Sequence, residues 1–239
     1  MSNLLDIKQL KAWYTSDKPV LKGLNLCLEK NSVIGLIGLN GAGKTTLMNV
    51  ICGLHDGFET SGISFNGKDI TFKDKNFIKS RYIVFSEDES FGYFTFNEYI
   101  AYVFKCYEKT LDKEYVNDLV SRFGFEEYRS VLIKNLSLGN RRKAYLITGF
   151  ALKPDLLLLD EPVNGLDFVS TETLYSLIGD YKKYGTVLFS SHILESVTLT
   201  SDRVLVLEEG VIAKTYTGDE INAENIRLSL DTEGTGNNV

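Results

Sequence analysis

The chain has 239 residues, of which 44% are hydrophobic and 24% are charged, with 20 glycines and three prolines. This composition excludes collagen-like, low-complexity and wholly disordered proteins, and the length is sufficient for one large α/β domain. The formal net charge of -6 argues against binding of nucleic acid through bulk electrostatics. We therefore expect no nucleic-acid partner, and only a local basic patch would change that expectation.

No targeting or membrane-spanning segment is predicted. The longest apolar runs fall short of the roughly 18 residues that a membrane span requires, and the N-terminal MSNLLDIKQL lacks the apolar core of a signal peptide. Cys27, Cys52 and Cys106 lie far apart without CxxC spacing, which is typical of a reduced compartment. We expect a cytoplasmic protein that meets any membrane from outside the bilayer.

Short apolar runs alternate with helical segments, a pattern typical of an α/β domain with a largely parallel sheet. The predicted strands are Leu4–Leu10, Val20–Leu28, Val33–Ile37, Ile63–Phe65, Tyr82–Phe85, Leu156–Leu159, Val187–Ser190 and Val204–Leu207. Asn66-Gly67 and Glu209-Gly210 each lie between apolar residues and predict hairpin turns.

Two segments differ from this alternation. Residues from about 96 to 152 are rich in Tyr, Phe, Lys and Glu at helical spacing and predict an inserted helical subdomain. Asp231–Val239 is polar, contains two glycines and is predicted to be a flexible tail.

The strongest local motif is a full match to the phosphate-loop pattern GxxxxGK(S/T), placed between a predicted strand and a helical run. Its residues are Gly38, Leu39, Asn40, Gly41, Ala42, Gly43, Lys44 and Thr45, followed by Thr46. Glycines let the loop turn its N–H groups towards a phosphate, and the following helix adds its positive dipole end. Lys44 supplies a cation for the β- and γ-phosphates, and the Thr45 hydroxyl is a hard ligand for Mg²⁺. The motif predicts a nucleoside triphosphate site, with a glycine-rich turn as the alternative.

A second candidate site follows the four leucines at 156–159, which lead into Asp160 and Glu161. Adjacent acids after a buried strand are costly unless they meet a cation or a solvated cleft, and the carboxyl ends of parallel strands line the ligand crevice. We predict that Asp160 holds Mg²⁺ through water and that Glu161 is the general base for the attacking water. The alternative is a solvated strand-to-helix turn.

The chain has two histidines. His192 follows the predicted strand Val187–Ser190, where it could contact the γ-phosphate or position the attacking water, or could be an incidental loop residue. His55 follows the phosphate-loop helix without a comparable context and is predicted to be structural.

Taken together, these motifs resemble the ATP-binding cassette (ABC) family over nearly the whole chain. Leu136-Ser137-Leu138-Gly139-Asn140 resembles the family's signature, usually LSGGQ, from which Leu138 and Asn140 depart. The resemblance is specific because several motifs occur in the family's order at suitable spacing.

Three further positions match the family. Residues 164–167, Asn-Gly-Leu-Asp, resemble its D-loop and end at Asp167. His192 falls at its switch histidine. Tyr14, or alternatively Trp13, lies where the family stacks an aromatic ring on adenine.

The resemblance implies a fold and a mechanism. The fold is a RecA-like phosphate-loop core with an N-terminal antiparallel β subdomain and an inserted α-helical subdomain at about 88–152, in one domain spanning 4–230. Two cassettes pair head to tail around two ATP molecules, as a homodimer or with a paired cassette, and hydrolysis lets them open. The implied catalytic residues are Lys44, Glu161 and His192, and the implied nucleotide contacts outside the phosphate loop are Tyr14, Ser137, Gly139, Asn140 and Asp167.

One departure concerns the glutamine that the family places where its strand enters the helical subdomain. Here the sequence reads Phe85-Ser86-Glu87, so either Ser86 or Glu87 takes that place. An acidic residue resembles some exporters of peptide antibiotics and implies Glu87 as a third Mg²⁺ ligand. A surface acid is the alternative for Glu87.

The function implied is the ATPase subunit of an ABC transporter, an exporter more than an importer, bound to an integral-membrane permease at the cytoplasmic face of the membrane. The basic run Arg141-Arg142-Lys143 resembles exporter-type cassettes, or is a solvated helix face. The alternatives are a soluble ABC ATPase of the metallocofactor-assembly type and a phosphate-loop kinase. The sequence does not name the transported substrate.

Overall fold

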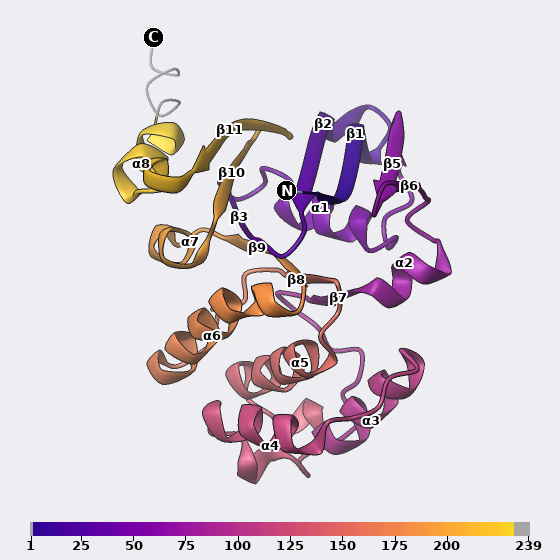
Figure 1. Ribbon diagram of the computed structural model, residues 1–239, viewed down its shortest axis with the longest axis vertical. Coiled ribbons are helices and arrows are strands. Elements are labelled where there is room, and N and C mark those ends of the chain that lie inside the picture. The colour runs from indigo at the N-terminus through magenta and orange to yellow at the C-terminus, as the bar shows by residue number, and fades with distance from the viewer. Residues whose placement is uncertain (1, 232–239) are drawn as a thin grey trace.

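In the computed structural model, which describes residues 2–231, the larger of two sheets has the strand order β11-β10-β3-β9-β8-β7 (Figure 1). Its strands are β3 (Val33–Ile37), β7 (Arg81–Val84), β8 (Leu156–Leu159), β9 (Thr186–Ser191), β10 (Arg203–Glu208) and β11 (Val211–Thr217). Neighbouring strands pair in parallel except β10 with β11. Every residue of β3, β8 and β9 is buried, because both faces of a parallel sheet are covered.

The second sheet is antiparallel and has the order β2-β1-β5-β6, with β4 beside β1. Its strands are β1 (Asn3–Thr15), β2 (Lys18–Glu29), β4 (Phe58–Glu59), β5 (Gly62–Phe65) and β6 (Lys68–Asp69). Both predicted hairpin turns are confirmed: Asn66-Gly67 joins β5 to β6 and Glu209-Gly210 joins β10 to β11. All four residues have positive φ, as the favoured two-residue turns require.

The inserted helical subdomain lies between β7 and β8 in the sequence and forms the end of the molecule opposite the antiparallel sheet (Figure 1). It contains α3 (Phe96–Cys106), α4 (Lys113–Arg122), the short 3₁₀ turns Glu126–Tyr128 and Ile133–Asn135, and α5 (Leu138–Leu152). Thr95 and Glu98 form a capping box on α3, and Asp112 and Ser137 cap α4 and α5. The expected core with an antiparallel and a helical subdomain is therefore confirmed.

Helix α5 packs against α3, α4 and β7, so most of its surface is covered. Arg142 and Lys143 are consequently buried, with 4% and 7% of their surface exposed. The alternative of a solvated helix face at 141–143 is wrong for these two residues, because the helix has protein on nearly every side.

The remaining helices flank the large sheet. They are α1 (Lys44–Ile51), α2 (Lys75–Ser80), α6 (Phe168–Asp180), α7 (Leu194–Thr200) and α8 (Ala223–Asp231), with 3₁₀ turns at Tyr181–Lys183 and Gly218–Glu220. Helix α8 was not predicted; it is held by the fully buried Ile226 in the core shared with α5 and α6. The predicted tail lies outside the described residues except Asp231, which ends α8. None of the helices between residues 2 and 231 has both the length and the apolar character needed to cross a bilayer.

Candidate active site

The phosphate loop joins β3 to α1, and its backbone is open to a ligand. Gly43 caps α1 with φ 108°, a left-handed conformation that suits glycine, and no side chain caps the helix. The first N–H groups of α1 are thus left for an anion. The Lys44 ammonium donates to the carbonyl oxygens of Gly38 (2.7 Å) and Leu39 (3.3 Å), so the cation lies inside the loop.

Thr45 and Asp160 come together although 115 residues separate them in the chain. The Thr45 hydroxyl donates to Asp160 Oδ2 at 3.0 Å, and the Ser190 hydroxyl donates to Asp160 Oδ1 at 2.7 Å. Asp160 is only 1% exposed. No group of three or more His, Cys, Asp or Glu within residues 2–231 could hold a metal alone. A divalent ion here would therefore depend on the Thr45–Asp160 pair together with ligand oxygens.

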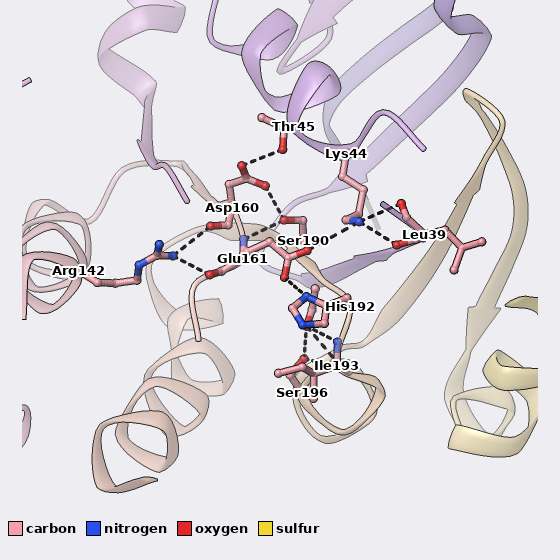
Figure 2. A network of polar contacts seen from close by, with 12 residues as sticks. Leu39, Lys44, Thr45, Arg142, Asp160, Glu161, Ser190, His192, Ile193 and Ser196 are labelled. Atoms are coloured by element: carbon pink, nitrogen blue, oxygen red, sulfur yellow. Dashed lines mark hydrogen bonds and ion pairs between the residues drawn. The ribbon is translucent and has the colours of Figure 1, made fainter. Parts of the chain in front are cut away.

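Glu161 occupies the centre of the site (Figure 2). Its Oε1 lies 3.7 Å from Lys44 Nζ, and its Oε2 lies 2.7 Å from His192 Nδ1. An ionised carboxylate only accepts hydrogen bonds, so Nδ1 of His192 carries the hydrogen and donates it. Glu161 has φ 46°, an uncommon left-handed conformation for a residue with a side chain. The structure thus brings the three predicted catalytic residues together.

Two buried side chains that sequence reasoning missed hold the backbone of Glu161. Its N–H donates to Ser190 Oγ at 2.9 Å, and its carbonyl accepts from Arg142 Nη1 at 2.6 Å. Arg142 also donates to the carbonyl oxygens of Asp160 (3.3 Å) and Ser86. Burial lowers the pKa of Arg142, while Asp160 and Glu161 oppose that shift. No sequence signal could have found the Arg142 contacts, because carbonyl acceptors are the same in every residue, and the Ser190 contact depends on two strand ends that meet only in the fold.

A cavity of about 460 Å³ lies over the phosphate loop. Its lining residues are Ile37, Gly38, Leu39, Asn40, Ser86, Glu87, Glu161, Asn164, His192 and Leu230. Because both Ser86 and Glu87 line it, the geometry admits either as the counterpart of the family's glutamine, and the role of Glu87 towards a metal stays a prediction. Ser137, Gly139 and Asn140 are not among its walls.

The signature segment, residues 136–140, forms the start of α5. The Ser137 hydroxyl accepts from the Asn140 N–H at 3.2 Å and caps the helix, which begins at Leu138. A Cβ on Gly139 would lie 2.2 Å from the carbonyl oxygen of Gly165, so only glycine allows the signature to pack against the D-loop. Leu138, which departs from the family pattern, lies against Gly165 and is otherwise half exposed.

Asp167 lies at the N-cap of α6 and not in the cavity. Its carboxylate accepts from the Ser170 N–H at 2.8 Å and from Lys143 Nζ at 2.7 Å. These two bonds hold the pKa of Asp167 well below its usual range, and the bond from Lys143 has the larger effect. Its predicted contact with nucleotide stays a prediction.

Tyr14 is better placed than Trp13 to stack on the adenine ring of a nucleotide. It is 68% exposed, and its hydroxyl lies 3.4 Å from Thr46 Oγ1 at the end of the phosphate loop. The His55 ring meets it edge-on with 4.9 Å between centroids. His55 is buried and hydrogen-bonds the Trp13 carbonyl at 2.9 Å, in agreement with the structural role predicted for it.

Comparisons with known proteins agree with this geometry. The family model described as ABC transporter matches residues 21–164. One relative is AlbC of Bacillus subtilis, which is named as an ABC transporter ATP-binding protein. It is 36% identical over 218 residues, and the alignment covers 89% of this chain and 91% of AlbC. The phosphate import ATP-binding protein PstB of Mycoplasma genitalium is 29% identical over 247 residues, 95% of this chain and 75% of PstB. A solved structure described as the ATP-binding subunit of an ABC transporter superposes with a TM-score of 0.82 at 27% identity, covering 95% of this chain and 94% of that chain.

Proposed function

Because this chain belongs to the ABC transporter family of ATP-binding, ATP-hydrolysing subunits, we propose that it powers export of a substrate through a separate membrane permease. One arrangement carries the ATP-hydrolysing part of this proposal: Glu161 lies between the Lys44 ammonium and the His192 imidazole, beside the phosphate loop. A carboxylate in this position is suited to take a proton from the water that attacks a γ-phosphate.

The residues present fit Mg²⁺·ATP. The uncapped first turn of α1 and the Lys44 ammonium suit the phosphates, and the exposed ring of Tyr14 suits the base. The Thr45 hydroxyl and Asp160 carboxylate are hard oxygens, as Mg²⁺ prefers. When bound, the ion would neutralise charge on the phosphates.

Glu161 and His192 would have different roles towards the attacking water. Glu161 would accept the water's proton, since its carboxylate is held at fixed distance from both neighbours. His192 donates from Nδ1 to Glu161, which fixes the orientation of its ring beside the base.

A second copy of the chain would complete the site. Ser137 and the N-terminus of α5 are exposed but do not line the chain's own cavity. Leu138, Phe168 and Val169 are exposed apolar residues next to the signature and the D-loop. In a head-to-tail pair, Ser137 and the Gly139 N–H would face the partner's γ-phosphate, and these apolar residues would be covered.

The proposals of a permease partner and of a direction of transport are supported by the relatives and by sequence resemblance. AlbC and PstB are both named as ATP-binding proteins, and PstB is named for import. Export is favoured by the Leu-Ser-x-Gly signature and by the acidic Glu87, which resemble exporter-type cassettes. With a permease partner, the chain would work at the cytoplasmic face of the membrane.

The test of the chemistry is Glu161→Gln in the full chain. ATP should still bind, turnover should fall on the order of 100-fold or more because the base is lost, and light scattering should detect ATP-dependent dimers. Glu114→Gln, an exposed acid in the first turn of α4, is the matched control and should leave turnover unchanged. Wild-type turnover in Glu161→Gln would refute the assignment.

The direction of transport is tested in the complex of this chain with its permease. After co-purification with its permease and reconstitution into vesicles, ATP is supplied only on the side that exposes the cassette. Export predicts that substrate moves away from that side, whereas movement towards it would identify an importer.

A further inference from the structure

Arg142 is a buried cation that forms no direct ion pair with a carboxylate among the described residues, although the charges of Asp160, Glu161 and Glu87 act on it. Its side chain is 4% exposed, and in the described part of the chain it takes part in no ion pair. Its guanidinium instead donates to the carbonyl oxygens of Ser86, Asp160 and Glu161 (Figure 2 draws the latter two). These acceptors belong to two places, the loop after β7 and the turn after β8.

Burying a charge in this way is expensive, and neutral polar side chains could serve a carbonyl at lower cost. What arginine adds is a rigid fork, whose Nη1 and Nη2 reach two separate segments at once. The fork therefore fixes the distance between the Ser86 carbonyl and the Glu161 carbonyl, which a shorter or flexible side chain would not do.

The backbone of Glu161 needs such support. Its φ of 46° is unfavourable for a residue with a side chain, and such conformations persist only where the surroundings impose them. Ser190 holds its N–H and Arg142 holds its carbonyl, at 2.9 and 2.6 Å. With both ends of this residue fixed, its carboxylate is directed between Lys44 and His192.

Arg142 also belongs to α5, the helix whose first turn is the signature. It stands five positions after Ser137, a little more than one helical turn along the same rigid element. A displacement of the start of α5 therefore moves the fork, and with it the carbonyls of both Glu161 and Ser86.

We propose that Arg142 is a positioning residue: it sets the orientation of the general base Glu161 and makes that orientation depend on where the signature helix lies. This inference rests on the proposed function, because it assumes that Glu161 is the base. Arg142 itself contacts neither nucleotide nor water in this scheme and acts only through the Glu161 backbone.

The experiment compares Arg142→Met, Arg142→Lys and the control Arg141→Met by ATPase kinetics of the full chain. Arg141 is the adjacent arginine; its side chain is partly buried and forms an ion pair with the exposed Glu89 at 3.2 Å, away from the Glu161 backbone. We expect Arg142→Met to lower kcat about 10- to 100-fold, since a misplacement of about 1 Å can cost that much. KM for ATP should stay within about threefold, because the phosphate loop is untouched. Arg142→Lys should recover part of kcat by reaching one carbonyl, and Arg141→Met should match the wild type.

A second comparison places Arg142→Met in the Glu161→Gln background. If Arg142 acts through the base, its loss should change the residual turnover of Glu161→Gln less than threefold, because the effects of substitutions at interacting residues are not additive. An equal fold-loss in both backgrounds, or a rise in KM that matches the fall in kcat, would make Arg142 merely structural and overturn the proposal. Failure of the proposed function is distinguishable, since it would appear as wild-type turnover in Glu161→Gln alone.

Discussion

Replacing Ser190 with alanine removes one buried hydroxyl that serves both acidic residues of the site. The hydroxyl donates to Asp160 Oδ1 at 2.7 Å and accepts from the Glu161 N–H at 2.9 Å. Its loss leaves a buried N–H without an acceptor and takes one donor from a carboxylate that is 1% exposed.

The magnitude follows from these two bonds. A buried polar group left unsatisfied costs about 1–3 kcal/mol, and a hydrogen bond to a charged group contributes about 1.5–3 kcal/mol. Thr45 still donates to Asp160, so Ser190→Ala should lower the free energy of unfolding by about 2–4 kcal/mol. For a domain of this size that corresponds to a fall in Tm of roughly 4–16 °C.

Thermal unfolding followed by circular dichroism measures the change, with Thr148→Val as the matched control. Thr148 is equally buried, but its hydroxyl only donates to the Ala144 carbonyl within α5. Its loss should cost less than about 1 kcal/mol. If both variants unfold at the same temperature, or if Ser190→Ala unfolds like the wild type, the bridging role of Ser190 is refuted.

Three further outcomes are expected. Lys44→Ala should weaken ATP binding about 10- to 100-fold in titrations, because a cation facing the phosphates is lost; unchanged affinity would contradict the assignment of the loop. Glu87→Ala should raise the Mg²⁺ concentration for half-maximal ATPase activity more than Ser86→Ala does, and the reverse order would identify the serine as the counterpart of glutamine. The depressed pKa of Asp167 stabilises the fold above the ordinary pKa of 3.8, and this stability is lost as pH falls through the folded value. Asp167→Asn should therefore lower Tm near pH 7 and have a smaller effect near pH 3, whereas a pH-independent difference would rule out the Lys143 bond as its cause.

Much of the site could be predicted because its parts are contiguous in sequence and depend on side-chain chemistry. The phosphate loop needs glycines and a lysine in fixed order, and the acids after the buried leucines at 156–159 have few structural uses. The parallel strands could be read as apolar runs because both sheet faces are covered. The hairpin at Asn66-Gly67 could be read because positive φ restricts the residue types.

The parts that could not be predicted depend on tertiary neighbours. Arg142 looked like a member of a charged surface run, and only the packing of α5 against the large sheet buries it. Ser190 looked like one more residue of a buried strand. The strands β4 and β6 are two residues long, too short for any alternation to be visible. Among the described residues of helix α8, Ile226 is the only fully buried apolar side chain, so the periodic signal of this helix is weak.

The close packing of Gly139 on Gly165 has a consequence for the stoichiometry of the proposed pair. Gly165 lies four residues after Glu161, the proposed base for the chain's own ATP, whereas Gly139 lies in the segment that would meet the partner's ATP. Two backbones in such contact move together, so in the proposed pair each chain would connect the two nucleotides mechanically. The two ATP molecules would then be hydrolysed cooperatively, and a mixed pair with one damaged signature would lose more than half of its turnover.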